Sequence, residues 1–183
     1  MITIREIEYE DIDKGFLKVL DNLLSPEIDN ILAKNILKEI KSNPFHKIFV
    51  VEDKKTGKIV GTTTLLVEPK FINKGMKVGY IEDVSVKKGY EGKRIGKQII
   101  DYVTNYAKTI QHCKKILLYC SERNKIFYEK LGFKSSENTF VMVMGNNNLT
   151  NTIINKKDNM SFTSLNSTTI GNTNTNNKTN GSL

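Results

Sequence analysis

The sequence has few cysteines and no long apolar run, and each lack excludes a class of protein. Cys113 and Cys120 are the only cysteines among 183 residues, too few for a disulfide framework or a cysteine-based metal site. Reduced thiols of this kind are typical of cytosolic proteins. No apolar run approaches the roughly 18 to 20 residues that span a bilayer, and charged residues from Arg5 to Asp13 interrupt the apolar core that a signal peptide needs. We therefore expect a cytoplasmic protein without a metal or a membrane span.

The net charge of +8 is high for a chain of this length. Lys156, Lys157 and Lys178, set against Asp158, place +2 of it in the C-terminal part, so residues 1–144 carry about +6. Such a field suits nucleic acid, a membrane surface or a phosphorylated small molecule. The basic residues alternate with acidic ones and have no interleaved aromatic residues, which argues against a nucleic-acid interface.

A change of composition at Gly145 marks the clearest boundary in the chain. Residues 145–183 contain 12 Asn, 8 Thr and 4 Ser among 39 residues, and their few apolar residues follow no period. This segment has too little apolar surface to offset the entropy of ordering it. We predict one domain over residues 1–144 and a disordered low-complexity tail over 145–183.

Within residues 1–144, apolar residues alternate between strand and helix spacing. Strands are predicted at 2–7, 47–51, 58–67, 78–86, 115–120 and 140–144, and helices at 12–24, 28–40, 94–110 and 125–131. Asp11 and Asn124 are predicted to cap the first and last helices. Three strands run together before the long helix, which excludes a doubly wound nucleotide-binding fold and predicts a mixed α/β sheet.

The junction between the strand ending at Val86 and the helix beginning near Arg94 is rich in glycine and basic residues. It reads Lys-Lys-Gly-Tyr-Glu-Gly-Lys-Arg-Ile-Gly-Lys over residues 87–97. Glycine lets the backbone turn tightly and approach a ligand, and a helix N-terminus offers unpaired amide N–H groups with partial positive charge. With Lys93, Arg94 and Lys97 added, these features predict an anion site. The spacing matches neither a dinucleotide fingerprint nor a P-loop.

This loop resembles the coenzyme A pyrophosphate loop of the GNAT superfamily of N-acetyltransferases, Gln/Arg-x-x-Gly-x-Gly/Ala. The register falls on residues 91–96, with Glu91 in place of Gln or Arg and Arg94 in place of the middle glycine. Residues 124–133, Asn-Lys-Ile-Phe-Tyr-Glu-Lys-Leu-Gly-Phe, resemble the second signature of the superfamily. The implied fold is the GNAT fold, a central twisted mixed sheet flanked by helices. The sheet would be splayed between the strands ending near Val86 and Cys120, so that the pantetheine arm can enter.

A third block is similar to the glucosamine-6-phosphate N-acetyltransferase family. It consists of Lys70-Phe-Ile-Asn73 and Gly79-Tyr-Ile-Glu-Asp-Val-Ser-Val86. The resemblance implies transfer of an acetyl group from acetyl-CoA to the 2-amine of glucosamine 6-phosphate, a step toward UDP-N-acetylglucosamine, by a homodimer. Acetyl-CoA is then the co-substrate, and no metal is required.

The resemblance also implies site residues. Glu82 and Asp83 would lie beside the amine and accept its proton, while Tyr128 would stand near the thioester sulfur and donate a proton to the departing thiolate. Backbone N–H groups would polarise the thioester carbonyl. The implied neighbours of the sugar phosphate are Lys70, Phe71, Ile72 and Asn73. The implied coenzyme contacts are Asp83, Val84, Val86, Glu91, Gly92, Lys93, Arg94, Ile95, Gly96, Asn124 and Tyr128.

Departures from that family leave the acceptor open. Asn73 stands where His is usual, and the predicted last strand at 140–144 has no Arg to bind the sugar phosphate. A phosphorylated substrate must then rely on Lys70, Lys114 or Lys115. The alternatives are a GNAT enzyme that acetylates a polyamine or a protein amine, and a non-catalytic acyl-CoA-binding module.

Overall fold

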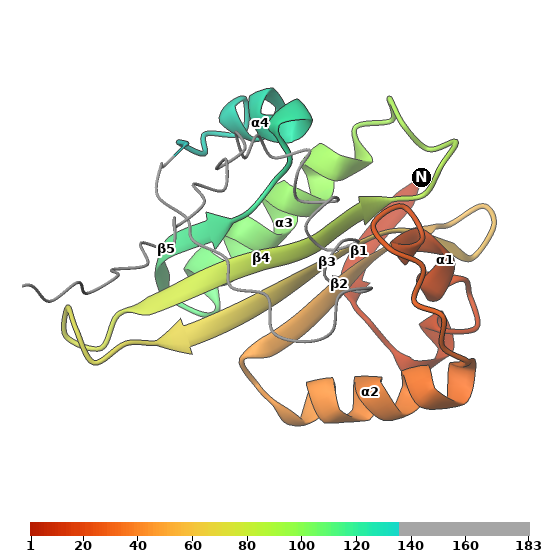
Figure 1. Cartoon of the computed structure of the whole chain (residues 1–183), viewed down its shortest axis with the longest axis horizontal. Coiled ribbons are helices and arrows are strands. Elements are labelled where there is room, and N and C mark those ends of the chain that lie inside the picture. Colours follow the sequence, from red (N-terminus) through yellow and green to blue (C-terminus); the bar gives the residue numbers. More distant parts are fainter. Residues whose placement is uncertain (136–183) are drawn as a thin grey trace, which may run out of the picture.

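The computed structural model describes residues 1–135, which form one mixed sheet with helices on both faces (Figure 1). In chain order the elements are β1 (Ile2–Glu6), the 3-10 turn η1 (Tyr9–Asp11), α1 (Phe16–Leu20), α2 (Asn30–Ser42), β2 (His46–Asp53), β3 (Lys58–Pro69), β4 (Lys77–Val86), α3 (Ile95–Thr109), β5 (Cys113–Leu118) and α4 (Glu122–Glu129). The predicted strand at 140–144 and the Asn/Thr-rich segment 145–183 lie outside the described residues. Up to α4, the predicted order of strands and main helices is confirmed.

The sheet has five strands in the order β1-β2-β3-β4-β5. Neighbours from β1 to β4 run antiparallel, whereas β4 and β5 run parallel. A tight turn joins β2 to β3. In this turn the Asp53 carboxylate accepts a hydrogen bond from Lys55 N (3.0 Å), and Gly57 reverses the chain at φ +64°. The parallel pair needs a crossover, which α3 supplies. The predicted mixed α/β sheet is therefore confirmed.

Each face of the sheet has its own apolar core. α3 and α4 cover one face, where the buried side chains include Phe49, Leu65, Ile81, Ile99 and Ile100. α1 and α2 cover the opposite face, where the buried side chains include Phe16, Val19, Leu37, Ile48 and Val50. The helical spacing of the apolar residues in α3 turns one stripe toward the sheet. The central strands therefore lie between two layers of helices.

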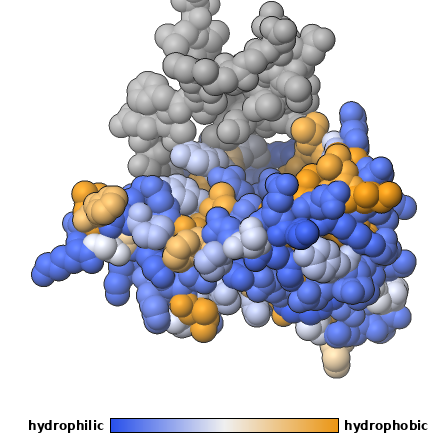
Figure 2. All heavy atoms as spheres, turned by 90° about the horizontal axis from the view of Figure 1, so that it is seen from below, coloured by the Kyte–Doolittle hydropathy of each residue, from blue (hydrophilic) through white to orange (hydrophobic). Residues whose placement is uncertain are grey.

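The side of the molecule seen in Figure 2 is mostly hydrophilic, with separate apolar patches. Exposed apolar side chains of the fold include Ile31 and Leu32 of α2 and Phe71 in the β3–β4 connection. No helix among residues 1–135 combines the length and the apolar character that a membrane span requires.

The predicted helix at 12–24 is much shorter in the structure, and Asp11 does not cap it. α1 begins after Gly15, which has φ +94°, and ends at Leu20. Asp11 closes η1 instead, and its buried carboxylate accepts hydrogen bonds from the Arg5 guanidinium (2.6 and 2.7 Å) and from Glu8 N (2.8 Å). The prediction is wrong because the same residue type serves as a helix cap and as a buried partner of an arginine.

The predicted cap of the last helix is also wrong. α4 begins after Ser121, so Asn124 lies inside its first turn with an exposed side chain. Serine and asparagine are both good capping residues, and the sequence alone does not decide between two of them three positions apart. The helix ends at Glu129, and Gly132 at φ +89° follows it.

Candidate active site

β4 and β5 separate before β4 ends. They pair from Lys77–Cys113 to Ile81–Leu118, whereas β4 stays paired with β3 as far as Val86. Within the described chain, β5 does not pair with residues 83–86 of β4, which form a free edge on that side. Backbone groups at such an edge are ready to pair with an extended ligand. The splay expected between these two strands is present.

A bulge in β4 lies at the start of the free edge. β4 places two residues, Asp83 and Val84, opposite the single residue Thr63 of β3. Asp83 has the left-handed conformation at φ +51°, which is uncommon for a residue other than glycine. Bulges of this kind re-aim a side chain, and backbone strain gathers at functional sites. The bulge therefore marks Asp83 as a candidate functional residue.

Two hydrogen bonds hold α1 and the segment after it against the end of β4. Ser85 Oγ donates to the Val19 carbonyl (2.6 Å) in the buried interior. Asn22 Nδ2 donates to the Val86 carbonyl (2.5 Å). The position of α1 over the sheet is thus fixed by the same stretch of β4 that carries the free edge.

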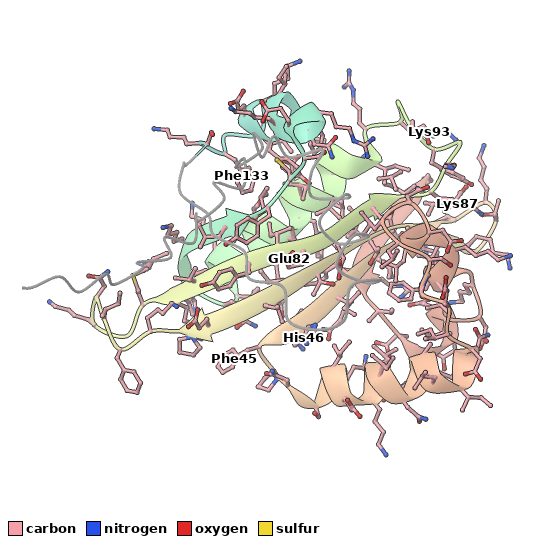
Figure 3. The ribbon with its side chains drawn as sticks, in the orientation of Figure 1. Phe45, His46, Glu82, Lys87, Lys93 and Phe133 are labelled. Atoms are coloured by element: carbon pink, nitrogen blue, oxygen red, sulfur yellow. The ribbon has the colours of Figure 1, made fainter. Side chains whose placement is uncertain are left out.

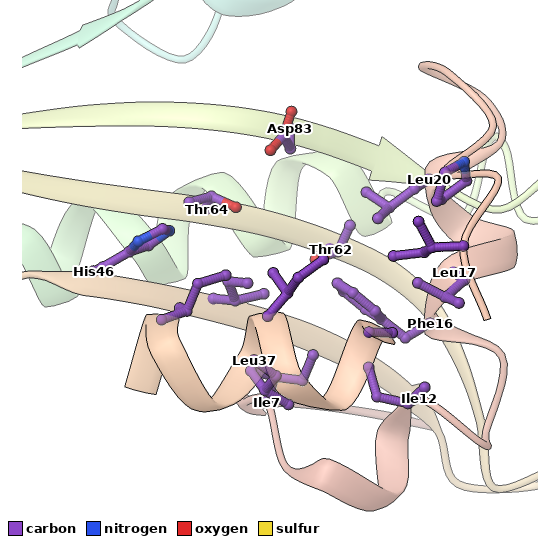
Figure 4. Close-up of a pocket in the computed structure, with 16 residues that line it drawn as sticks. Ile7, Ile12, Phe16, Leu17, Leu20, Leu37, His46, Thr62, Thr64 and Asp83 are labelled. Carbon is purple, nitrogen blue, oxygen red and sulfur yellow. The ribbon is translucent and has the colours of Figure 1, made fainter. Parts of the chain in front are cut away.

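The Asp83 side chain lines a cavity between the sheet and the helices α1 and α2 (Figure 4). The cavity has a volume of about 230 Å³, and its walls are mostly isoleucine, leucine and phenylalanine side chains. Its polar groups come from neighbouring strands: His46 of β2, Thr62 and Thr64 of β3, and Asp83 of β4. An apolar hollow with a few convergent polar groups is typical of a small-molecule site.

Asp83 and His46 lie close enough to affect each other's charge. Protein atoms around the Asp83 carboxyl displace water and raise its pKa even though one side of the residue is open to solvent, and His46 opposes this effect. Burial lowers the pKa of His46, and Asp83 opposes that shift in turn. A carboxylate with a raised pKa is a better proton acceptor near neutral pH.

The loop between β4 and α3 follows the free edge directly, and Lys87 and Lys93 lie beyond the end of β4 (Figure 3). Gly89 and Gly92 have φ +85° and +75°, conformations that glycine adopts without strain. Arg94 has φ +59° at the N-cap of α3, where the resemblance expects glycine. The structure brings residues 91–96 together at the start of this helix.

Glu91 folds back onto its own loop. Its carboxylate accepts a hydrogen bond from Gly89 N at 2.6 Å. Backbone amides turned by left-handed residues form concave anion sites, so Glu91 occupies a donor that a bound anion would otherwise use. Lys97 pairs with Asp101 one helical turn further along α3 (2.6 Å). Lys93 and Arg94 are exposed.

Tyr128 of α4 is buried on the sheet face opposite the cavity. Burial raises the pKa of Tyr128 to about 12, with a smaller contribution from Cys120. Its ring makes edge contacts with Phe127 and Phe133 at centroid distances of 5.0 and 5.9 Å. Gly96 of α3 lies beside the Phe127 ring, where an added Cβ atom would make ordinary van der Waals contact at 3.4 Å.

The residues expected at a sugar phosphate lie at the other end of β4. Lys70, Phe71, Ile72 and Asn73 connect β3 to β4, and Lys114 and Lys115 lie at the exposed start of β5. A strand rises about 3.3 Å per residue, so six residues of β4 separate this end from Asp83 by about 20 Å. A single chain therefore does not bring these lysines to Asp83.

The β3–β4 connection is itself held by local contacts. Lys70 pairs with the Glu68 carboxylate, which also accepts a hydrogen bond from the Tyr80 hydroxyl (2.8 Å). Asn73 Nδ2 contacts Met76 Sδ at 3.2 Å. Phe71 is fully exposed, so the tip of this hairpin presents an apolar ring to solvent.

The sequence reasoning missed His46, Thr62 and Thr64. No local motif surrounds His46, which reaches the site because β2, β3 and β4 are neighbours in the sheet. The described residues contain no group of His, Cys, Asp and Glu side chains suited to holding a metal ion. The arrangement offers a proton acceptor, a free strand edge, a glycine-containing loop with exposed basic residues and a buried phenol.

Comparisons with known proteins agree with this geometry. A profile of the Acetyltransferase (GNAT) family matches residues 16–133. The glucosamine 6-phosphate N-acetyltransferase of Arabidopsis thaliana is 35% identical over 134 residues, 72% of this chain and 89% of that protein. The glucosamine 6-phosphate N-acetyltransferase 1 of Dictyostelium discoideum is 34% identical over 134 residues, 73% of this chain and 85% of that protein.

A solved structure shows the same likeness in three dimensions. The crystal structure of the Arabidopsis thaliana glucosamine-6-phosphate N-acetyltransferase superposes with a TM-score of 0.75 at 32% identity. The match covers 79% of this chain and 99% of that one. The expected GNAT fold is thereby confirmed. The chain belongs to the GNAT acetyltransferases and, within them, to the glucosamine 6-phosphate N-acetyltransferase family.

Proposed function

We propose that the protein transfers the acetyl group of acetyl-CoA to the 2-amine of glucosamine 6-phosphate in the cytoplasm, on the route to UDP-N-acetylglucosamine. The observation that supports acetyl transfer is the free edge of β4, with its bulge at Asp83 beside a cavity. The acceptor rests on relatives that match this chain over most of their length and are named for that substrate. The products are N-acetylglucosamine 6-phosphate and coenzyme A.

The coenzyme fits the splayed side of the sheet. Its pantetheine amides would pair with the backbone of Val84 and Val86 as an added strand. Its pyrophosphate would lie on the 91–96 loop, where amides at the start of α3 and the side chains of Lys93 and Arg94 favour an anion. The thioester would then lie between the Asp83 bulge and α4.

Asp83 is the preferred base of the Glu82–Asp83 pair. A protonated amine has no lone pair for attack, so it must first lose a proton, and the raised pKa of the Asp83 carboxyl suits this step. The neutral amine attacks the thioester carbonyl, and backbone N–H groups at the bulge stabilise the charge that develops on its oxygen. Collapse of the intermediate breaks the C–S bond, and the proton that the nitrogen loses to become an amide passes to the departing thiolate, so that coenzyme A leaves as the free thiol.

Tyr128 acts on the leaving group. With a pKa raised to about 12 by burial, its hydroxyl stays protonated at neutral pH. A thiol is a stronger acid, with a pKa of about 8.5, so full transfer of the proton from Tyr128 is uphill. We therefore assign Tyr128 a hydrogen bond to the sulfur as negative charge develops there.

The Tyr128→Phe variant tests that role. Losing a hydrogen bond to a charged sulfur is expected to lower kcat by about 10- to 100-fold while the KM for acetyl-CoA changes little. The phenyl ring keeps the packing against Phe133, so the fold should be retained. Steady-state thiol release measures both constants, and Tyr9→Phe on the distant η1 is the matched control. An unchanged kcat would remove Tyr128 from the mechanism.

The lysines proposed for the phosphate of the acceptor would come from a second subunit. Within one chain, Lys70, Lys114 and Lys115 lie about 20 Å along the sheet from Asp83. We propose a homodimer in which the β3–β4 hairpin of one subunit, with exposed Phe71 and Ile72, reaches the site of the other. The sugar phosphate would then meet lysines from the partner.

One observation favours a second candidate, a module that binds acyl-CoA without turnover. Glu91 places a negative charge in the loop that should hold the pyrophosphate and occupies the Gly89 amide. Such a loop departs from the expected coenzyme site, as in a chain that has kept the fold and lost turnover. The intact bulge and the buried Tyr128 argue for catalysis.

Thiol release from acetyl-CoA with three amines distinguishes these functions. Glucosamine 6-phosphate, glucosamine and spermidine are offered in parallel to the full chain, and coenzyme binding is measured by calorimetry in the same buffer. Turnover with the sugar phosphate alone is the expected result. Turnover with spermidine would assign a different acceptor, and binding without turnover would favour the module.

A further inference from the structure

Tyr90, in the β4–α3 loop, links a carboxylate and an ammonium group. Its hydroxyl donates to Asp53 Oδ2 at 2.9 Å. Lys93 Nζ lies over the same ring, 4.0 Å from its centroid. The loop that precedes α3 is thereby tied to the β2–β3 turn, which lies far from it in the sequence. The family resemblance assigns no binding role to Tyr90.

Asp53 is a fixed anchor for this link. It ends β2, and its carboxylate also accepts a hydrogen bond from Lys55 N within the turn (3.0 Å). Hydrogen bonds from Lys55 N and the Tyr90 hydroxyl, with a further contribution from Lys93, keep the pKa of Asp53 low. The Tyr90 hydroxyl, whose pKa is raised by the bond to Asp53, stays a donor. The anchor is therefore charged at neutral pH.

The ring also has a fixed place. Tyr90 packs against the apolar core under α3 and is only partly exposed. An exposed lysine has many rotamers, and ordering it on a ligand costs conformational entropy. A cation held over an aromatic face is already ordered before the ligand arrives. Lys93 thus has a preferred position at a loop whose neighbouring residue, Glu91, is acidic.

We propose that Tyr90 is a positioning residue that holds Lys93 for the pyrophosphate of coenzyme A. Lys93 then supplies, from a prearranged position, the positive charge that residue 91 does not supply in this chain. The inference rests on the proposed coenzyme site and adds to it a residue that acts through another. Because Lys93 lies within residues 91–96, we assign it to the pyrophosphate and not to the 3′-phosphate.

Calorimetric titration with coenzyme A tests the link in the full-length protein. Tyr90→Phe removes the hydroxyl and keeps the ring, and it is expected to raise the Kd by about 5-fold, as for the loss of one hydrogen bond. The KM for acetyl-CoA should rise by the same factor with kcat unchanged. Asp53→Asn, which keeps an oxygen acceptor, is expected to give a smaller rise. Tyr9→Phe, where Lys41 lies over the ring at 5.8 Å, is the matched control.

A double-mutant cycle separates positioning from a structural effect. If Tyr90 acts through Lys93, Tyr90→Phe has no further effect on Kd in the Lys93→Ala background. The same 5-fold loss should appear with dephospho-coenzyme A, because that ligand keeps the pyrophosphate. Thermal unfolding of each variant checks that the folded protein is being titrated.

Several results would overturn the inference. An unchanged Kd in Tyr90→Phe, a full additional loss in the Lys93→Ala background, or a loss that disappears with dephospho-coenzyme A would each do so. If the unsubstituted protein does not bind coenzyme A, the proposed function falls together with this inference. If it binds but does not acetylate glucosamine 6-phosphate, the acceptor assignment falls and the role of Tyr90 stands on the titrations.

Discussion

Replacing Asp83 with asparagine is expected to lower kcat by about 10²- to 10³-fold, the usual loss when a general base is removed. The amide cannot take the proton from the acceptor amine. Asparagine tolerates the left-handed conformation that residue 83 adopts at φ +51°, so the bulge should survive. Steady-state thiol release with acetyl-CoA and glucosamine 6-phosphate measures the change, and the KM for acetyl-CoA should stay close to that of the unsubstituted protein.

The dependence of the reaction rate on pH gives a second test of Asp83 as the base. Asp83 accepts a proton only when ionised, so the rate falls as the pH drops through its pKa. Burial raises that pKa, which places the acidic limb above the range of an exposed aspartate. The Asp83→Asn variant should lose the part of this limb that belongs to Asp83 and keep the fall that comes from protonation of the acceptor amine itself.

Two further variants serve as controls for Asp83→Asn. Asp13→Asn changes an exposed carboxylate in the segment before α1 and should leave kcat unchanged. Glu82→Gln is expected to have a smaller effect than Asp83→Asn, because the cavity is lined by Asp83. If Glu82→Gln proves the more damaging change, the base is Glu82 and the assignment to Asp83 is wrong.

The largest expected loss of stability follows from Asp11→Asn. The free energy of unfolding should fall by about 2 kcal/mol, because the amide cannot replace the two charge-assisted hydrogen bonds and Arg5 keeps only its pair with Glu52. Arg5 donates to both oxygens of the buried Asp11 carboxylate, and Glu8 N donates to one of them. Urea unfolding followed by circular dichroism measures the difference.

The same carboxylate predicts how stability changes with pH. Burial alone would raise the pKa of Asp11, but hydrogen bonds from Arg5 and Glu8 N outweigh it, and the pKa is lowered. A group with a lowered folded-state pKa stabilises the fold above its unfolded pKa of about 3.9, and this contribution is lost as the pH falls toward the folded value. Asp11→Asn should therefore lose less stability in acid than the unsubstituted protein.

Asp13→Asn serves as the control for this prediction as well. Asp13 pairs with Lys34 at the surface, and exposed ion pairs contribute little to stability. An Asp11→Asn variant as stable as Asp13→Asn would show that the Arg5–Asp11 pair does not hold the first strand to η1.

The strands and helices that position the site follow from patterns within short segments. The apolar spacing of α3 and the alternation of strands predict the sheet, and the glycines at 89 and 92 predict the turns of the loop. The third left-handed residue, Arg94, has no such signal, because its residue type is ordinary inside a helix.

Contacts between segments that are far apart in the chain could not be predicted from the sequence. His46 meets Asp83 only because three strands stand side by side, and the bulge that turns Asp83 depends on the register of β3 against β4. From its residue type alone, Asp11 is predicted to cap a helix. Its actual partner is Arg5, which also binds Glu52, 47 residues further along the chain. The Tyr90–Asp53 bond likewise joins a loop to a turn 37 residues away.

Identifying the product tests whether the protein acetylates the 2-amine of glucosamine 6-phosphate. The full-length protein is incubated with glucosamine 6-phosphate and acetyl-CoA labelled with carbon-13 in the acetyl group, and the products are followed by nuclear magnetic resonance. We expect one new amide at the 2-nitrogen of the sugar, formed in step with free coenzyme A. Release of coenzyme A without that amide, or an unreacted sugar beside a protein that binds the coenzyme, would contradict this expectation.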